Sequence, residues 1–300
     1  MQSEKIPFDA TGAFSSFFLD YIHQKDSLKP FYHRFPSRDQ FNEQLNEKAA
    51  AYSASSRQTL VAALHRQYDG YNLPEQVIKN LNALAQPGTF TVTTGHQLNI
   101  FTGPLYFIYK IITVINTCRQ LKDAYPQHHF VPVYWMASED HDYEEIKSFR
   151  LDGKKYTWET KQQGAVGRFH TKDFNKLLNE VPGNTELFRK AYTQHETLAG
   201  AVRYYVNELF GEDGLIVIDG DDHALKQLFI PVMEQDLFHH ITQQQVNDTN
   251  AALEASGYKA QVYCREINFF YLDNQLRSRI EKTDSGFAVV DTPLTFSNDE

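Results

Sequence analysis

The chain has 300 residues, of which 41% are hydrophobic and 22% charged, with a formal net charge of −9 at pH 7. This composition is typical of one large or two smaller globular domains and excludes a disordered chain. The acidic balance argues against broad nucleic-acid binding, because phosphates need a basic surface. The sequence has no apolar run of the ~18 residues that a membrane span needs, and its start lacks a secretory pattern. We therefore expect a cytoplasmic protein with no membrane and no nucleic-acid partner.

Residues 1–88 are predicted to form a helical N-terminal region that packs on the core. Apolar side chains recur there at helical spacing, and Asp69-Gly70 and Pro87-Gly88 interrupt the pattern. The predicted helices cover residues 14–22, 39–54, 57–68 and 74–85.

Residues 89–147 predict the first part of a parallel sheet. A strand over 90–94 is followed by a glycine-containing loop and a helix over 105–121, and a second strand over 130–137 then ends in polar residues. The helix carries apolar residues on most sides, so we expect it to be largely buried. Strand, helix and strand in this order place the two polar strand ends side by side, where parallel sheets bind ligands.

The remaining chain predicts an inserted segment, a further core strand and a small antiparallel insert. Residues 148–210 are expected to form a hairpin followed by helices with a break at Pro182-Gly183. Residues 211–256 hold an apolar strand over 215–219 and helices bounded near Pro231. Residues 257–300 alternate as small antiparallel strands do, and we expect the chain to stop before the rest of the core. The fold class is therefore α/β.

The loop before the predicted 105–121 helix is a candidate anion site. The first N–H groups of a helix have no partner within it, and the helix dipole places positive potential there. Lys110 can point back toward this start, and Pro104 suits the first helical position after a Thr102 or Gly103 cap. The alternative is that Gly103-Pro104 only starts the helix and Lys110 is solvated. The assigned residues are Thr94, Gly95, Thr102, Gly103, Tyr106 and Lys110.

Two side chains at the end of the first strand are candidate catalytic groups. His96 and Gln97 can donate hydrogen bonds or move protons near a reacting carboxyl. The alternative for His96 is a structural histidine with satisfied hydrogen bonds.

The second strand ends in five carboxylates and one imidazole within residues 139–145. So many acids are costly together unless donors or cations compensate them. The cluster can bind a metal, grip an amine or sugar hydroxyls, or form a solvated turn with Ser138 as N-cap. Since no spaced second His or Cys accompanies it, we rank substrate binding above metal binding and assign no metal ligand.

Three aspartates, Asp219, Asp221 and Asp222, follow the apolar strand over 215–219. They face the same crevice as the other strand ends or cap the next helix, and the sequence leaves both readings open. Cys118 lies in the predicted buried helix and is expected to be an inert core thiol.

The two motifs TTGHQLNIFTGPLYFIYK and PVYWMASEDHDYEEI closely resemble the bacillithiol-biosynthesis cysteine-adding enzyme family, BshC. That family's pattern is met here by Thr94, Gly95, Gln97, residues 101–104, Tyr106 and Lys110, and then by Pro132, Val133, Trp135, residues 137–142, Glu144 and Glu145. LIVIDGDD and INFFYL also resemble the family. His96 departs from it, since the family often has Gln there. The resemblance covers the whole chain but only the first part of a longer family chain.

The resemblance implies a Rossmann-like core with inserted connecting segments, and a coiled coil that makes the longer family chain a homodimer. It also implies the last step of bacillithiol synthesis, an amide between the cysteine carboxylate and the amine of glucosaminyl malate. Residues 102–105 also resemble the start of the class I aminoacyl-tRNA synthetase ATP signature, but its two histidines are missing here. ATP or ADP with magnesium is the cofactor we consider, and the mode of activation stays open.

The leading hypothesis is therefore a cysteine ligase. Asp140, His141 and Asp142 are assigned to amine contact and the base, His96 and Gln97 to the reacting carboxyl, and Trp135, Ser138 and Glu139 to substrate binding. One alternative is a nucleotide- or sugar-binding module without turnover. Another is a metal-dependent hydrolase that uses the acidic cluster.

Overall fold

The structure, a computed structural model, describes residues 4–300, which form two compact units. One unit joins the described residues up to Lys48 with Met233–Asn268. The other joins Ala49–Val232 with Phe269–Glu300. The segment boundaries proposed from the sequence stay predictions.

The smaller unit is helical, and aromatic contacts hold its two chain segments together. The ring of Phe17 lies 5.4 Å from that of Tyr258, whose hydroxyl donates to Asp20 at 2.9 Å. Asp236 is buried and accepts the backbone N–H groups of Thr242 and Asn268, at 3.2 and 3.0 Å. Helices lying wholly or mainly in this unit are α1 (Phe8–Thr11), α2 (Ser16–Ile22), α3 (Phe41–Ala51), α12 (Ile230–His239) and α13 (Ile241–Ala255).

The larger unit is built on a parallel sheet. Its strands β1 (Thr89–Gln97), β2 (His129–Ala137) and β5 (Ile216–Asp219) lie in the order β1-β2-β5 and are all parallel. Gln97 pairs with Ala137, and Met136 with Asp219, so the three carboxyl ends are level. This arrangement confirms the predicted α/β core.

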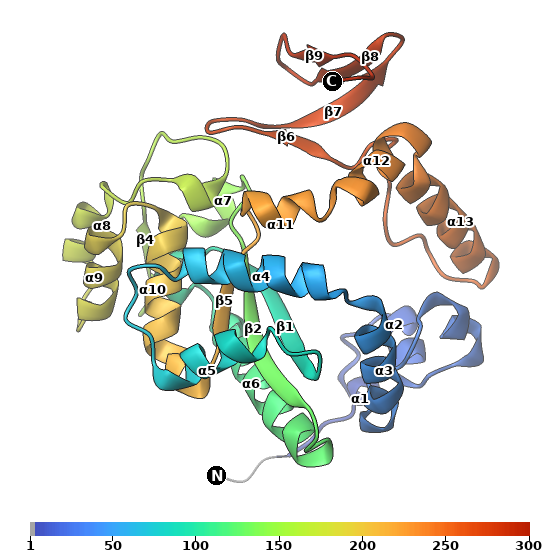
Figure 1. The fold of residues 1–300 in the computed structure, drawn as a ribbon, viewed down its shortest axis with the longest axis horizontal. Coiled ribbons are helices and arrows are strands. Elements are labelled where there is room, and N and C mark those ends of the chain that lie inside the picture. Colours follow the sequence, from blue (N-terminus) through green and yellow to red (C-terminus); the bar gives the residue numbers. More distant parts are fainter. Residues whose placement is uncertain (1–3) are drawn as a thin grey trace. The chain divides into compact units, whose positions relative to one another are not determined.

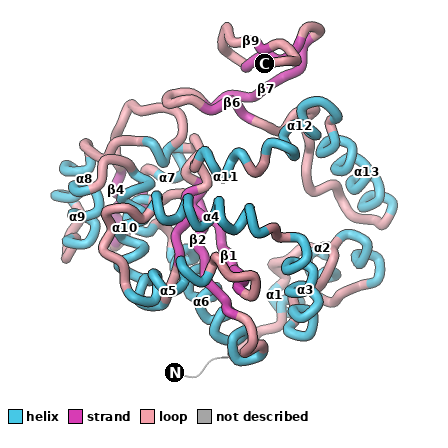
Figure 2. The backbone as a smooth tube through the Cα atoms, in the orientation of Figure 1, coloured by secondary structure: helices cyan, strands magenta, loops and turns pink. Residues whose placement is uncertain are grey.

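Helices cover the sheet, as Figures 1 and 2 show. The helix that links β1 to β2, α6 (Leu105–Ala124), packs on both strands. Three other helices, α4 (Ala54–Gln67), α5 (Glu75–Ala83) and α10 (Leu198–Phe210), pack on β5. The centre of β2 is buried from Phe130 to Tyr134 because both faces are covered. Each large apolar side chain buried in this way stabilises the fold by about 1.5–3 kcal/mol.

The segment between β2 and β5 has its own aromatic core. Phe174 stacks on Trp158 and Tyr192, with ring centroids 4.2 and 3.9 Å apart. The predicted hairpin forms, with Ser148 paired with Thr157. Its elements, with the helix after β5, are α7 (Tyr143–Ile146), β3 (Ser148–Leu151), β4 (Lys154–Thr157), α8 (Phe174–Glu180), α9 (Glu186–Gln194) and α11 (His223–Gln227).

The predicted antiparallel insert is confirmed in its second half. Four strands, in the order β6-β7-β8-β9, pair antiparallel after Asn268. Residues 261–267 form no strand, which corrects the predicted start of this sheet. The strands are β6 (Phe270–Leu272), β7 (Arg277–Thr283), β8 (Gly286–Val289) and β9 (Thr295–Phe296).

Three further expectations about the β1–α6 region are corrected. Strand β1 continues to Gln97, so Gly95 lies in the strand rather than in the loop, because its pairing with β2 does not stop at Thr94. Pro104 is the N-cap of α6 and not its first residue. The helix is buried on one side only: Leu105, Tyr109 and Ile112 are exposed, so its all-round apolar pattern does not mean all-round burial.

Over the described part of the chain, no helix combines the length and apolar character needed to cross a lipid bilayer.

Candidate functional site

The ends of β1 and β2 are joined by one glutamine. Gln97 Nε2 donates to Asp140 Oδ2 at 2.8 Å and to Glu145 Oε2 at 2.6 Å. The chain reversals after the two strands are therefore neighbours, as predicted from the strand–helix–strand pattern. Gln97 supplies donor hydrogens to two carboxylates that would otherwise repel each other.

The start of α6 borders a cavity of about 880 Å³, which we call the α6 cavity. Gly103 has φ 60° and ψ −140°, and a Cβ there would lie 2.5 Å from Asn99 Cβ, so only glycine fits. Arg150 and Lys155 of the β3–β4 hairpin also line this cavity, as does Glu145, whose carboxylate accepts from Gln97. The helix dipole and two cations against one hydrogen-bonded acid make this cavity suited to a carboxylate or phosphate. The predicted residues that line it are His96, Gln97, Thr102, Gly103 and Tyr106.

Lys110 points back toward the start of α6, as the lean of helical side chains predicts. Its ammonium donates to the carbonyl oxygen of Gly95 at 2.6 Å and so ties α6 to β1. Thr94, Gly95 and Lys110 are not among the residues that line the α6 cavity. The structure thus divides the predicted anion site into two groups. Thr102, Gly103 and Tyr106 line the cavity, whereas Lys110 and Gly95 hold α6 against β1.

His96 lies between β1 and the first turn of α6. Its Nδ1 donates to the carbonyl oxygen of Gln97 at 2.9 Å, and its ring lies 5.1 Å from Tyr106 and 5.5 Å from Phe107. Burial lowers the pKa of His96 and, with the charge of Lys110, outweighs the hydrogen bond to Gln97 that raises it. The imidazole is therefore neutral at physiological pH.

The acidic cluster is divided into separate hydrogen-bonded groups. Asp140 Oδ1 accepts the N–H groups of His141 and Asp142, at 2.7 and 3.3 Å. Burial raises the pKa of Asp140, but the hydrogen bonds from Gln97, Asp142 and His141 outweigh it and the net pKa is lowered. Asp142 is the N-cap of α7, accepting the N–H of Glu145 at 3.2 Å. The turn does cap a helix, but Asp142 does so in place of Ser138.

The imidazole of His141 faces the antiparallel sheet. Arg277 Nη1 lies 2.7 Å from His141 Nδ1, and the guanidinium stacks 3.9 Å from the centre of the Phe270 ring. Since Arg277 has only donors, Nδ1 accepts and the proton of a neutral imidazole sits on Nε2. His141 is then a hydrogen-bond donor on its open side.

Glu139 of the same turn has a raised pKa. Burial raises it, Asp219 and Asp221 add to the effect, and Lys226 opposes it. Glu139 Oε2 is buried without a hydrogen-bond partner within residues 4–300. A carboxyl in this state takes up a proton more readily than the fully bonded Asp140.

The end of β5 carries a cluster that the sequence only partly indicated. Ser138 donates to Asp219 Oδ1, which also accepts the N–H of Asp221 at 3.0 Å. Arg168 binds Asp221 through Nε at 2.6 Å and Nη2 at 3.0 Å, and Lys226 binds the same carboxylate. Burial raises the pKa of Asp221, but these two cations outweigh it and the net pKa is lowered.

Asp222 is a helix cap, which is the alternative role that the sequence left open for the three aspartates after β5. It caps α11 by accepting the N–H groups of Ala224 and Leu225, at 2.9 and 3.1 Å. Asp219 and Asp221 therefore line a cavity at the end of β5, described below, whereas Asp222 caps the helix start.

Two side chains, Gln67 and the buried Arg203, fix the position of Asp219. Gln67 at the end of α4 accepts the N–H of Asp219 at 2.9 Å and donates to its carbonyl at 3.0 Å, as a neighbouring strand would. Arg203 of α10 is buried and donates to Gln67 at 3.0 Å through both Nη1 and Nη2. Sequence reasoning missed both residues, since their partners lie 136–152 positions away along the chain.

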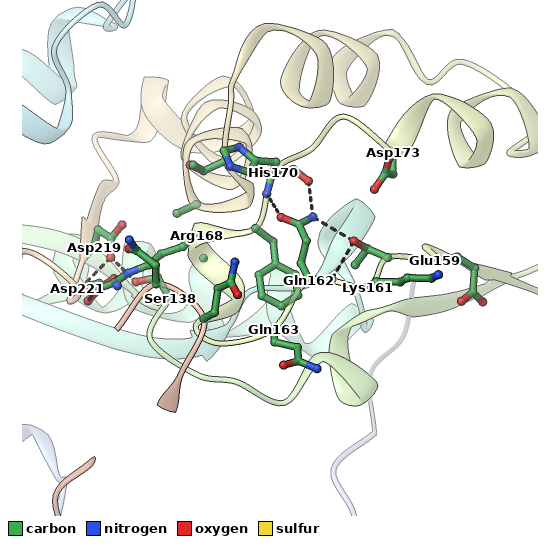
Figure 3. A pocket seen from close by; sticks show the side chains of 17 residues that line it. Ser138, Glu159, Lys161, Gln162, Gln163, Arg168, His170, Asp173, Asp219 and Asp221 are labelled. Carbon is green, nitrogen blue, oxygen red and sulfur yellow. Dashed lines mark hydrogen bonds and ion pairs between the residues drawn. The ribbon is translucent and has the colours of Figure 1, made fainter. Parts of the chain in front are cut away.

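A second cavity of about 1140 Å³, the β5 cavity, opens beside this cluster. Figure 3 shows Ser138, Arg168, Asp219 and Asp221 on one side of it, and Lys161, Gln162 and Glu159 on the other. Sequence reasoning did not predict it. The only local signal was the pair Gly164 and Gly167: a Cβ on Gly167 would lie 2.5 Å from Ser138 Cβ, so the loop needs glycine to approach the strand end.

Trp135, predicted to bind substrate, is 38% exposed on β2. Its indole covers Gly220, where a Cβ would lie 2.5 Å from the ring. It is not among the residues that line the α6 or β5 cavity.

Within residues 4–300, no group of three or more His, Cys, Asp or Glu side chains is arranged to hold a metal ion. In the acidic turn, which comprises residues 139–145, Asp140 instead accepts hydrogen bonds from Gln97 and from backbone N–H groups. Cys118 is buried, and burial raises the pKa of its thiol to about 12, as expected for an inert core residue.

Comparison with known proteins identifies the relatives of this chain. Residues 1–300 match the family model described as "Bacillithiol biosynthesis BshC, N-terminal Rossmann-like domain". Proteins named "Putative cysteine ligase BshC" from Flavobacterium psychrophilum and Christiangramia forsetii are 42% and 40% identical over the whole chain. One from Cytophaga hutchinsonii is 42% identical over 99% of it. The chain spans 56–58% of the length of these relatives.

Proposed function

Because the chain belongs to the BshC family, as its Rossmann-like N-terminal domain, we propose that it carries the ligase site that joins the cysteine carboxylate to the amine of glucosaminyl malate. The observation that carries this proposal is the bridge from Gln97 to Asp140 and Glu145. It brings the anion-suited α6 cavity into contact with the acidic turn, as a reaction between a carboxylate and an amine requires.

Amide formation imposes three demands on the site. The carboxylate must be activated, the ammonium must lose a proton, and the negative charge that develops on the carboxyl oxygen must be stabilised. The amine nitrogen then bonds to the carboxyl carbon while one oxygen departs with the activating group. ATP or ADP with magnesium is our proposed source of activation.

The α6 cavity serves the first and the third demand, because positive potential there holds the activating group and stabilises the negative charge that develops on the carboxyl oxygen. The start of α6, Arg150 and Lys155 supply the positive potential for a phosphate or carboxylate. Thr102 and Gly103 line the cavity. Lys110 does not line it but supports it, because its hydrogen bond to Gly95 holds α6 against β1. His96 and Gln97 lie at the boundary with the acidic turn. Both amide hydrogens of Gln97 are engaged by Asp140 and Glu145, so Gln97 positions the turn beside the reacting carboxyl. His96 is our candidate for moving a proton near that carboxyl.

The acidic turn meets the second demand. Asp140 is held charged and oriented, which suits contact with an ammonium, and His141 offers Nε2–H to a hydroxyl or carbonyl oxygen. Glu139 is our candidate for the proton acceptor, because burial raises its pKa and Oε2 is unbonded within residues 4–300. Asp142 supports the turn through its cap.

A binding module without turnover is the second candidate, favoured by the 58% share of its relatives that the chain spans. In this case the chain binds nucleotide or sugar, and the remaining part of a longer polypeptide completes the site. For the full-length protein, we also propose a cytoplasmic location and a homodimer that forms through a coiled coil.

The test is product formation by the full-length polypeptide that carries this chain. Cysteine, glucosaminyl malate, ATP and magnesium should give a product whose mass is the sum of both substrates less water. Asp140→Asn should lower kcat by ~100-fold or more, since it removes a charge that acts on the amine. Absence of the product would favour the binding module.

Glu144→Gln is the matched control. Glu144 is an exposed acid of the same turn that pairs only with Lys147 in the described structure, so its loss should change kcat by less than ~3-fold. Equal kcat values in the Asp140 and Glu144 variants, with both folded by circular dichroism, would remove Asp140 from the site.

A further inference from the structure

The segment between β1 and α6, which we call the 99–103 loop, has an unusual backbone. Phe101, Thr102 and Gly103 have φ values of 51°, 65° and 60°, so three consecutive residues have positive φ. Glycine adopts such angles freely, but an aromatic residue and a threonine do so only at a cost in free energy. These conformations persist where the surrounding structure holds them, and they are concentrated at functional sites.

Aromatic side chains from the segment between β2 and β5 hold the ring of Phe101. The ring is buried, and its centroid lies 4.9 Å from that of Phe149 on β3 and 4.8 Å from that of Phe188 on α9. These ring contacts fix the position of the side chain. They do not by themselves fix the direction of the backbone groups on either side of it.

Two buried tyrosine hydroxyls bind those backbone groups. Tyr192 of α9 accepts the N–H of Phe101 at 2.9 Å, and Tyr205 of α10 donates to the carbonyl oxygen of Asn99 at 2.7 Å. The two tyrosines are 2% and 1% exposed, and burial raises the pKa of both hydroxyls, so each keeps its proton. Because a buried N–H or C=O without a partner is costly, the hydroxyls favour the one backbone arrangement in which both bonds form.

This backbone arrangement decides where α6 begins. Thr102 and Gly103 line the α6 cavity, and Pro104 follows them as the N-cap of the helix. Leu105 and Tyr106 also line the cavity, and their N–H groups are the first of α6 and have no partner within the helix. A change in the loop backbone would therefore move the groups that give the cavity its positive potential.

From this geometry we propose that Tyr192 and Tyr205 are positioning residues for anion binding in the α6 cavity. Their hydroxyls hold the 99–103 loop in the conformation that presents the start of α6 to an anion. Neither tyrosine is among the residues that line the cavity, so each acts through the loop, 91 and 106 positions away along the chain. The inference rests on the proposed function, because it supports the cavity that we assign to the activating group.

The test compares buried tyrosines that make the same kind of hydrogen bond. Tyr68 accepts the N–H of Val217 at 2.7 Å, as Tyr192 accepts that of Phe101, but its partner lies in β5 and outside the α6 cavity. Tyr192→Phe and Tyr68→Phe each keep the ring and remove one hydroxyl from a buried N–H, so they should lose similar stability in urea denaturation. Calorimetry with inorganic pyrophosphate on the full chain should show affinity weakened ~10-fold in Tyr192→Phe and Tyr205→Phe, and less than ~2-fold in Tyr68→Phe.

Amide hydrogen exchange reports the loop conformation without any ligand. Exchange of the Phe101 N–H should be faster by ~10-fold in Tyr192→Phe and unchanged in Tyr68→Phe. Equal pyrophosphate affinities in these two variants, or no saturable binding of pyrophosphate to the parent chain, would overturn the inference. Faster exchange with unchanged affinity would also overturn it, since the hydroxyl would then have a structural role only.

The proposed function can fail separately from this inference. Pyrophosphate binding that depends on Tyr192, without amide product from the full-length polypeptide, would contradict the proposed function and retain the inference. Amide product formed by the full-length Tyr192→Phe variant with the parent's kcat and the parent's KM for ATP would contradict the inference alone.

Discussion

The α6 and β5 cavities lie at the carboxyl edge of the same sheet, but they are assembled differently. Residues 96–108 supply most of the α6 cavity as one continuous segment, and Glu145 and the β3–β4 hairpin supply the rest. The β5 cavity needs five segments separated by up to 137 positions, from Ser138 to Gln275. Local sequence therefore indicates the first cavity and is silent about the second.

The charges in the two cavities also have different origins. The α6 cavity draws its positive potential from a helix start, which the strand–loop–helix pattern provides, and from Arg150 and Lys155. In the β5 cavity the charge balance depends on pairing, because Arg168 and Lys226 both bind Asp221.

The largest expected effect tests the backbone origin of the α6 cavity. Gly103→Ala should lower the free energy of unfolding by about 2–4 kcal/mol, because it combines a strained φ with a clash against Asn99. Gly88→Ala is the control, since Gly88 has open space around its Cβ position and no positive φ. Urea denaturation measures both, and equal values would show that the helix start is not constrained as described.

A smaller effect tests the paired charges of the β5 cavity. Arg168→Met should destabilise the protein by about 1–2 kcal/mol at pH 7, because Asp221 keeps only Lys226. Arg168→Lys should recover part of this loss, as it restores the charge but not the two-point contact. If both variants match the parent in urea denaturation, the pair contributes nothing to the cavity's stability.

The smallest effect concerns His96. Its pKa is lowered in the folded state, so the unfolded chain binds the proton first as pH falls below the ordinary value of about 6.5. The contribution of neutral His96 to the free energy of unfolding is therefore complete above the ordinary pKa. It is lost as pH falls through the lowered pKa of the folded state. His96→Gln should flatten this part of the stability-versus-pH curve. A parent and a variant with identical curves would mean that His96 titrates as in the unfolded chain.

The sequence predicted most elements of the larger unit because their patterns are local. Apolar runs at 130–137 and 215–219 gave buried parallel strands, and helical spacing gave α4, α5 and α6. The prediction that the two strand ends are neighbours followed from the strand–helix–strand order. The end of β1 was misplaced by three residues, because hydrogen bonding to β2, and not strand propensity, extends it to Gln97.

The sequence by itself determined the order of the sheet elements, the helix start with its glycine, and the concentration of acids after β2. These features depend on residues that are neighbours along the chain. Only the tertiary structure decided that Asp142 caps a helix while Glu139 is buried and unbonded, and that Arg168 and Lys226 share Asp221. The physical reason is that pKa values and cavities depend on which groups lie within a few ångströms, and folding brings those groups from distant positions.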